Sequence, residues 1–186
     1  MTALPQHKMT VDEYLAWAEG RPGRYELYAG VVYAMAPERA GHAEVKYAVQ
    51  TALLAAIRKA SVGCHMLPDG MTVRVDSMTA HEPDALVYCG GKLPHSAIEV
   101  PNPIIVVEVL SPSTRHIDAS AKIAGYFSVP SVQHYLIVDP EQPLAIHHAR
   151  AADEAITTRI LHHDVILLDP PGIEVAVQDF YPSPAD

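Results

Sequence analysis

The sequence has little cysteine and no long apolar run. Its 186 residues include two cysteines, Cys64 and Cys89, which do not form a Cys-x-x-Cys motif. Two cysteines are too few for the disulfide framework of a small secreted protein, so a reducing compartment is expected. No segment approaches the roughly 18 consecutive apolar residues of a membrane span, and residues 1–8 lack the apolar stretch of a signal peptide. We therefore expect a cytoplasmic protein with no membrane segment.

Positive charge is also scarce. The chain has 13 basic and 22 acidic residues, and its formal net charge is -9. Such a molecule repels nucleic acid at long range, so any bound nucleic acid must meet a local basic patch. The chain also lacks a phosphate loop ending in Gly-Lys-Ser/Thr, a GxGxxG motif after a strand, the HExxH zinc motif and the GxSxG nucleophile motif. Its chemistry must therefore come from another arrangement of residues.

The chain does contain enough apolar residues to build a core. Hydrophobic residues make up 49% of it, which suits one compact domain over residues 1–186. Helical spacing of these residues and suitable capping residues indicate where helices begin and end. The predicted helices run from Thr10 to about Ala18, from Gly41 to about Ala60, and from Ser113 or Thr114 to about Ser128.

Short apolar or alternating runs bounded by glycine and proline predict the strands. They are Arg24–Tyr28 and Val31–Ala36, which form an N-terminal hairpin, then Cys64–Leu67, Met71–Val75, Asp84–Tyr88, Ile104–Leu110 and Val132–Val138, and the C-terminal strands Leu144–His148, Thr157–Leu161, Val165–Leu168 and Ile173–Val177. This order predicts an α/β (α+β) fold, with a mixed β-sheet flanked by helices and a core over about residues 41–140.

Glu108 lies in the otherwise apolar run Ile104–Leu110. Such a run is typical of a buried strand, where an unpaired charge is costly. A second acid, Asp84, opens another predicted strand. Because side chains alternate along a strand, the two acids can converge if their strands are neighbours. Such a pair suits Mg²⁺ or Mn²⁺, since hard cations prefer oxygen ligands; alternatively, Asp84 caps a strand end and Glu108 pairs with an arginine.

Four other residues are candidates for the same site. Asp118 precedes Lys122 by one helical turn, so the two can form an exposed ion pair; alternatively, Lys122 reaches back toward Glu108. His42, near a helix start, can contact a phosphate or order a carboxylate. Glu26 is either a third acid in the cleft or a partner of Arg24.

Other residues give weak signals. The adjacent pairs His147-His148 and His162-His163 are expected at the surface, because neighbouring side chains on a strand point to opposite faces. Neither cysteine has an obvious histidine partner, which argues against a catalytic thiol.

Several of these residues together resemble a known family. The resemblance rests on Tyr25-Glu26-Leu27 with Gly30, Gly41-His42, Pro83-Asp84, Val107-Glu108-Val109-Leu110-Ser111-Pro112-Ser113-Thr114, Asp118, Lys122, Tyr126 and Tyr135-Leu136-Ile137-Val138-Asp139-Pro140. This set spans roughly Tyr14 to His148 and resembles the Uma family of putative restriction endonucleases, within the PD-(D/E)XK nuclease superfamily.

The resemblance implies a restriction-endonuclease-like core of helix, three-stranded β-meander, helix and strand. Asp84 would be the acid of the Pro-Asp motif, and Glu108 the acid of the (Asp/Glu)-x-Lys motif. Leu110 stands where that motif has its lysine, and the family pattern implies that Lys122 on the following helix takes this place. The chain also departs from the pattern at Val31, where relatives commonly carry an acid.

The expected function is Mg²⁺-dependent hydrolysis of DNA phosphodiester bonds by a homodimer, to which the C-terminal strands can supply an interface. Asp84 and Glu108 would hold Mg²⁺ or Mn²⁺, and Lys122 would orient the attacking water. Glu26, His42 and Asp118 would contact substrate or support these residues. Two alternatives stay open: a nuclease-like binding or regulatory module without catalysis, and a metal-dependent hydrolase of small phosphate esters.

Overall fold

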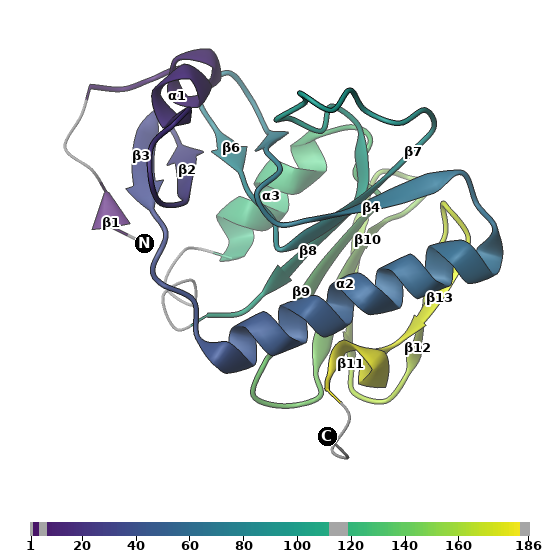
Figure 1. Ribbon diagram of the computed structural model, residues 1–186. Helices are drawn as coiled ribbons and strands as arrows, with labels where there is room; N and C mark the ends of the chain where they lie inside the picture. Colours follow the sequence, from purple (N-terminus) through teal and green to yellow (C-terminus); the bar gives the residue numbers. More distant parts are fainter. Residues whose placement is uncertain (1, 4–6, 112–118, 183–186) are drawn as a thin grey trace.

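The computed structural model describes residues 2–3, 7–111 and 119–182. Its largest sheet has six strands in the order β11-β10-β9-β8-β7-β4 (Figure 1). These strands are β4 (Cys64–Pro68), β7 (Ala85–Cys89), β8 (Pro103–Val109), β9 (His134–Val138), β10 (Ala145–Arg150) and β11 (Ile156–Leu161). β8 and β9 are parallel and the other neighbours are antiparallel, so the sheet is mixed, as predicted.

A second sheet contains the predicted N-terminal hairpin. Its five strands follow the order β1-β3-β2-β6-β5. They are β1 (Thr2–Ala3), β2 (Tyr25–Tyr28), β3 (Val31–Ala34), β5 (Val73–Arg74) and β6 (Ala80–His81). The turn between β2 and β3 needs positive φ at Gly30, where an added Cβ would lie 2.6 Å from the Met78 side chain. This position therefore requires glycine.

The predicted strand Met71–Val75 belongs to this second sheet and not to the core meander. Only Val73–Arg74 forms a strand there, and it pairs with β6, which the sequence did not predict. The three-stranded meander consists of β4, β7 and β8, and the β5 and β6 pair is inserted between its first two strands. β6 in turn pairs with β2, so the insertion fastens the hairpin sheet to the core.

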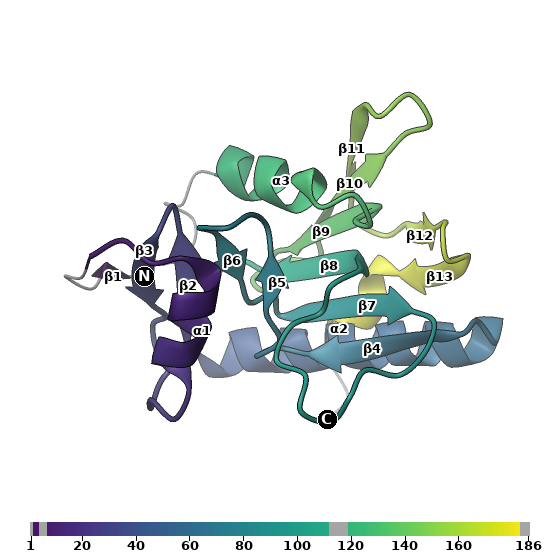
Figure 2. The same ribbon diagram turned by 90° about the horizontal axis from the view of Figure 1, so that it is seen from above.

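Helices cover both faces of the six-stranded sheet (Figure 2). One face carries α2 (Ala40–Ala60), the β12 (Val165–Leu168) and β13 (Ile173–Ala176) hairpin and the 3-10 helix η1 (Val177–Phe180). The other face carries α3 (Ala119–Ser128). The helix α1 (Val11–Ala18), with its predicted capping box at Thr10, packs on the hairpin sheet. Ser113 and Thr114, predicted to begin the last helix, lie outside the described residues.

The alternation along β8 decides which face each side chain meets. Val107 and Val109 pack in the core under α2, whereas Val106 packs in the core under α3. Glu108 lies between Val107 and Val109 in the chain, so its side chain points to the opposite face of the sheet, the one that α3 covers. The helix that follows in the chain therefore covers this carboxylate.

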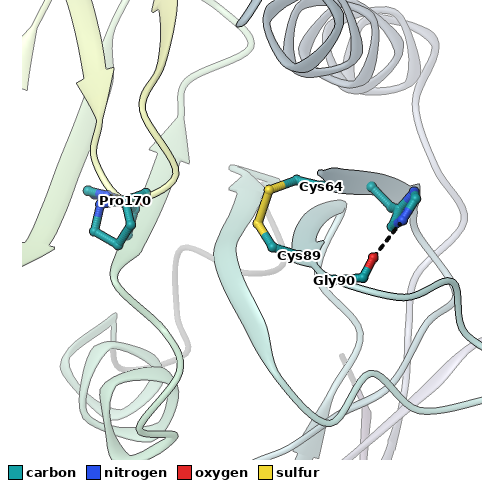
Figure 3. The surroundings of a disulfide bond; sticks show 6 residues. Cys64, Cys89, Gly90 and Pro170 are labelled. Carbon is teal, nitrogen blue, oxygen red and sulfur yellow. Dashed lines mark hydrogen bonds between the residues drawn. A yellow bond between two sulfur atoms is a disulfide. The ribbon is translucent and has the colours of Figure 1, made fainter. Parts of the chain in front are cut away.

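Cys64 and Cys89 form a disulfide (Figure 3). They occupy facing positions at one end of the β4 and β7 pair. The expectation of a reducing compartment rested on the low cysteine count, and the pairing of the two residues removes that argument. Within the described part of the chain, no helix is both long and apolar enough to cross a membrane.

Candidate active site

Asp84 and Glu108 meet at one end of the β7 and β8 pair. Ala85 faces Val107 in the register of the two strands, so the next facing positions outward are those of the two acids. Both side chains are buried, with exposures of 6% for Asp84 and 9% for Glu108. The main-chain N–H of Val109 donates to Asp84 Oδ2 over 2.8 Å, which fixes one oxygen of that carboxylate.

The protonation of Asp84 reflects this proximity. Burial and the neighbouring charge of Glu108 together raise its pKa to about 6, against the hydrogen bond from Val109. A buried carboxyl group beside a second acid is a place where a cation is electrostatically favoured. The geometry thus agrees with the prediction that Asp84 and Glu108 converge.

Lys122 compensates the buried charge of Glu108. Its Nζ donates to Glu108 Oε1 over 2.8 Å, and the hydroxyl of Tyr126 donates to the same oxygen over 2.7 Å. Burial by itself would lower the pKa of Lys122, but the charges of Glu108 and Glu26 outweigh it and the pKa is raised. Lys122 is therefore a buried ammonium that contacts Glu108, the second of the two arrangements left open by the sequence.

Glu26 brings a third carboxylate to this cluster from β2 in the second sheet. It is 2% exposed and accepts hydrogen bonds from Lys122 Nζ and from the main-chain N–H of Glu82, each over 3.1 Å. Arg24, the alternative partner of Glu26, instead donates to Asp69 over 2.5 Å. Glu26 thus contacts Lys122, which in turn contacts Glu108.

His81 lies behind this cluster and was missed by the sequence analysis. It is 2% exposed, and its Nδ1 lies 3.9 Å from Glu26 Oε2. Neither ring nitrogen has a hydrogen-bond partner among the described residues. Burial and the charge of Lys122 together lower its pKa to about 4. The ring is therefore neutral and adds no charge to the cluster.

His42, in the first turn of α2, lies beside Asp84. Its Nε2 is 2.9 Å from the main-chain oxygen of Val109 and 3.7 Å from Asp84 Oδ2, and its Nδ1 is 2.7 Å from Glu38 Oε1. Both partners are oxygen acceptors, so the ring donates to at least one of them. His42 therefore lies next to Asp84 and ties α2 to the end of β8.

These side chains line one pocket of about 650 Å³. The walls are formed by the segment from Met35 to His42, the end of β8 and the turn after β9. Asp84, Glu108, Lys122 and Glu26 all line it.

Two further contacts support the acids, and neither was assigned from the sequence. Gln50 of α2 donates its amide to the main-chain oxygen of Asp84 over 2.8 Å. Tyr126 lies one helical turn after Lys122, and that spacing is a signal from which its contact with Glu108 could have been predicted. Asp118, a predicted neighbour of Lys122, lies outside the described residues.

The prediction that His147 and His148 are surface residues is wrong. They are 5% and 6% exposed, because the strands around β10 and the elements on both sheet faces cover both sides of the strand. His162 and His163 are exposed, as predicted.

The donor set fits a hard divalent cation. Two carboxylates meet at the pocket floor, and each uses one oxygen in the hydrogen bonds above. Within residues 2–3, 7–111 and 119–182, no group of three or more His, Cys, Asp and Glu side chains could hold a metal. A cation that keeps several water ligands, such as Mg²⁺, suits a site with only two carboxylates.

The mixed sheet with helices on both faces defines a restriction-endonuclease-like fold. The model of the Uma2 family, described as "Putative restriction endonuclease", matches residues 11–179. The chain belongs to this family, as its sequence resemblance implied.

Two proteins are similar to this chain over nearly its whole length. An uncharacterized protein of Synechocystis sp., slr1290, is 26% identical over 191 residues, which cover 96% of this chain and 94% of that protein. The crystal structure of a putative nuclease belonging to DUF820 from Anabaena variabilis superposes with a TM-score of 0.71 at 13% identity. That match covers 93% of this chain and 97% of the other, and it confirms the predicted fold.

Proposed function

We propose that the protein is a Mg²⁺-dependent endonuclease that hydrolyses phosphodiester bonds of DNA. The observation that carries this proposal is the contact of Lys122 with Glu108 at the floor of a pocket that Asp84 also lines. Two carboxylates and an ammonium at one point are the groups needed to hold a cation and to stabilise a phosphoryl group under attack by water. Membership of the Uma2 family supports the same chemistry.

Each residue has a defined role in this proposal. Asp84 and Glu108 hold Mg²⁺, or Mn²⁺ in its place. When bound, the cation polarises the phosphoryl group and lowers the pKa of a bound water. Lys122 orients the water and stabilises negative charge on the phosphoryl oxygens. The hydroxyl of Tyr126 donates a hydrogen bond to Glu108 Oε1, which keeps the carboxylate facing the pocket.

The supporting residues act through these three. Glu26 positions Lys122 by accepting one of its hydrogen bonds. His42 holds the start of α2 against the end of β8 and faces Asp84. Asp118 remains a proposed substrate contact on the segment before α3.

Cleavage assays on a DNA oligonucleotide that has both a duplex part and a single-stranded tail test this function. The wild type is expected to nick or cut the DNA in Mg²⁺ or Mn²⁺ and to be inactive in EDTA. Asp84→Asn and Glu108→Gln are expected to lose activity by a factor of about 100 or more. Glu174→Gln, an exposed carboxylate on β13, is the matched control and is expected to retain activity. Equal activity in the wild type and both site variants contradicts the proposal.

Two other functions use parts of the same site. A hydrolase of small phosphate esters is favoured by the pocket volume of about 650 Å³, which suits a ligand of nucleotide size. A panel of nucleotides and oligonucleotides separates it from the endonuclease. A binding module without catalysis is favoured by the net charge of -9. Calorimetric titration tests that reading, because a binding module need not take up Mg²⁺ or Mn²⁺ at millimolar concentration.

We also propose that two copies of the chain form a homodimer through β11. This strand lies at one edge of the six-stranded sheet, and five of its six residues are exposed. Ile160 is 65% exposed there, and an open antiparallel edge can pair with a second copy of itself. Size-exclusion chromatography with light scattering is expected to give a dimer that Ile160→Lys converts to a monomer. A monomeric wild type contradicts the proposal.

A further inference from the structure

The groups proposed to act on phosphorus lie deep in the pocket. Asp84, Glu108 and Lys122 are 6%, 9% and 7% exposed, although all three line it. A phosphodiester must therefore enter the pocket before it can meet these groups. The pocket is also lined by the segment between β3 and α2 and by Pro140 and Glu141. Arg39 in that segment is exposed, so this part of the lining meets solvent.

The shape of the site disfavours duplex DNA. A duplex is stiff, with a persistence length of about 150 base pairs, and both of its strands are held by stacking and pairing. Bringing one phosphodiester of a duplex into a pocket of about 650 Å³ therefore carries the added cost of deforming the paired helix. A single strand is flexible and can bring one phosphodiester to the floor without that cost.

The charge of the site also disfavours duplex DNA. Five carboxylates line the pocket: Glu26, Glu38, Asp84, Glu108 and Glu141. The lining has three lysine and arginine side chains, Arg24, Arg39 and Lys122, which are fewer than its carboxylates, so its formal charge is negative. Duplex DNA carries about one charge per 1.7 Å of axis, twice the density of one strand, so the acidic walls repel it more strongly.

Arg39 differs from Arg24 and Lys122, the other lysine and arginine side chains among the described lining residues, because both of those are held in ion pairs. It precedes α2, its side chain is exposed, and no ion pair holds it within the described ranges. An arginine without an ion-pair partner at the pocket entrance can bind one phosphate of a DNA strand while the next phosphate of that strand lies deeper in the pocket.

We propose that the substrate is single-stranded DNA and that Arg39 binds its backbone at the pocket entrance. This rests on the proposed function for the chemistry at the floor, whereas the preference for one strand rests on burial and charge. Unpaired tails and gaps are then cut, and continuous duplex is a poor ligand.

Binding and cleavage test the two parts separately. Fluorescence anisotropy in Ca²⁺, which also takes oxygen ligands, compares a labelled strand of about 16 nucleotides with the blunt duplex of the same sequence. The Kd for the strand is expected to be at least about 10-fold lower. Arg39→Ala is expected to weaken strand binding several-fold and to reduce the slope of log Kd against log salt by about 0.7. Arg58→Ala, exposed near the other end of α2, is the matched control and should bind as the wild type does.

Equal or tighter binding of the duplex overturns the inference, as does an Arg39→Ala variant that binds like Arg58→Ala. In the cleavage arm, a duplex with a single-stranded tail is incubated with Mn²⁺, and cuts are expected in the tail. Cuts spread equally through the duplex also overturn the inference. Strand-selective binding without any cleavage supports the inference and contradicts the proposed endonuclease.

Discussion

Lys122 Nζ lies 2.8 Å from Glu108 Oε1, and both side chains are almost fully buried. The pair joins the end of the central strand β8 to the helix packed over it. Because the second Lys122 contact is to Glu26, one ammonium neutralises carboxylates from two different sheets. The stability of the fold and the electrostatics of the proposed site therefore depend on the same side chain.

Replacing Lys122 tests this double dependence. Lys122→Met removes one partner of a buried ion pair and leaves two uncompensated carboxylates, so it should lower the free energy of unfolding by about 3 kcal/mol. The same variant should bind Mg²⁺ more tightly, because the ammonium no longer occupies Glu108 Oε1. Urea unfolding and calorimetry measure the two effects. Unchanged stability together with weaker Mg²⁺ binding would refute this account.

Tyr126 is expected to stabilise the fold by its hydrogen bond to Glu108. Tyr126→Phe keeps the ring but removes a donor to a buried charged group, which should cost about 2 kcal/mol in urea unfolding. Tyr47→Phe is the matched control, because Tyr47 is 72% exposed, and should leave stability unchanged. Equal stability of the two variants would show that the Tyr126 hydroxyl contributes nothing.

A pair of histidines should make the protein sensitive to acid. His134 Nε2 donates to the main-chain oxygen of Pro170 over 3.0 Å, so its Nδ1 accepts from His147 Nε2 over 2.9 Å. Both rings are neutral in this arrangement. Burial is the main reason why the pKa of His147 is lowered to about 4.

The unfolded chain therefore takes up a proton on His147 before the folded protein does. Stability from this group is present above its ordinary pKa of about 6.5 and is lost as the pH falls toward about 4. The loss should reach about 2 kcal/mol. His147→Gln, which can still donate to His134, should flatten the dependence of stability on pH between those values, whereas the exposed His163→Gln should not. Parallel curves for the wild type and His147→Gln would contradict the argument.

The disulfide should stabilise the protein without affecting the site. Cys64 and Cys89 are separated by 25 positions, and closing a loop of this length restricts the unfolded chain by about 3 kcal/mol. Reduction, or the double change Cys64→Ala and Cys89→Ala, should lower Tm. Mg²⁺ affinity should stay the same, because Asp84 lies at the opposite end of β7. A parallel loss of metal affinity would mean that the bridge also orders the acids.

Local patterns in the sequence predicted the central features of the site. Alternation along β8 placed Glu108 on one face, and its apolar surroundings indicated a compensating partner. Asp84 and Glu108 were predicted to converge because each lies on a short apolar strand, and the register from Ala85 to Val107 brings them together. The resemblance to the Uma family, and not spacing, singled out Lys122.

The features that were missed depend on contacts between distant parts of the chain. The partner of Glu26 is Lys122 and not Arg24, and this contact joins residues that lie 96 positions apart in the chain. β6 has two residues, too few to give a periodic signal. His147 and His148 have the alternation of a half-exposed strand, but elements far along the chain cover both faces of β10.

The position of Glu26 in the chain limits how far the protein can be shortened. A fragment that begins at Gly41 would contain the helix, the meander and both acids of the pocket, yet it would leave Lys122 with only one of its two carboxylates. During synthesis, Glu26 leaves the ribosome long before the helix that carries its partner. Nearly a hundred further residues must therefore be synthesised before Lys122 can neutralise Glu26 of the hairpin sheet. The site is completed only when the N-terminal segment and α3 come together.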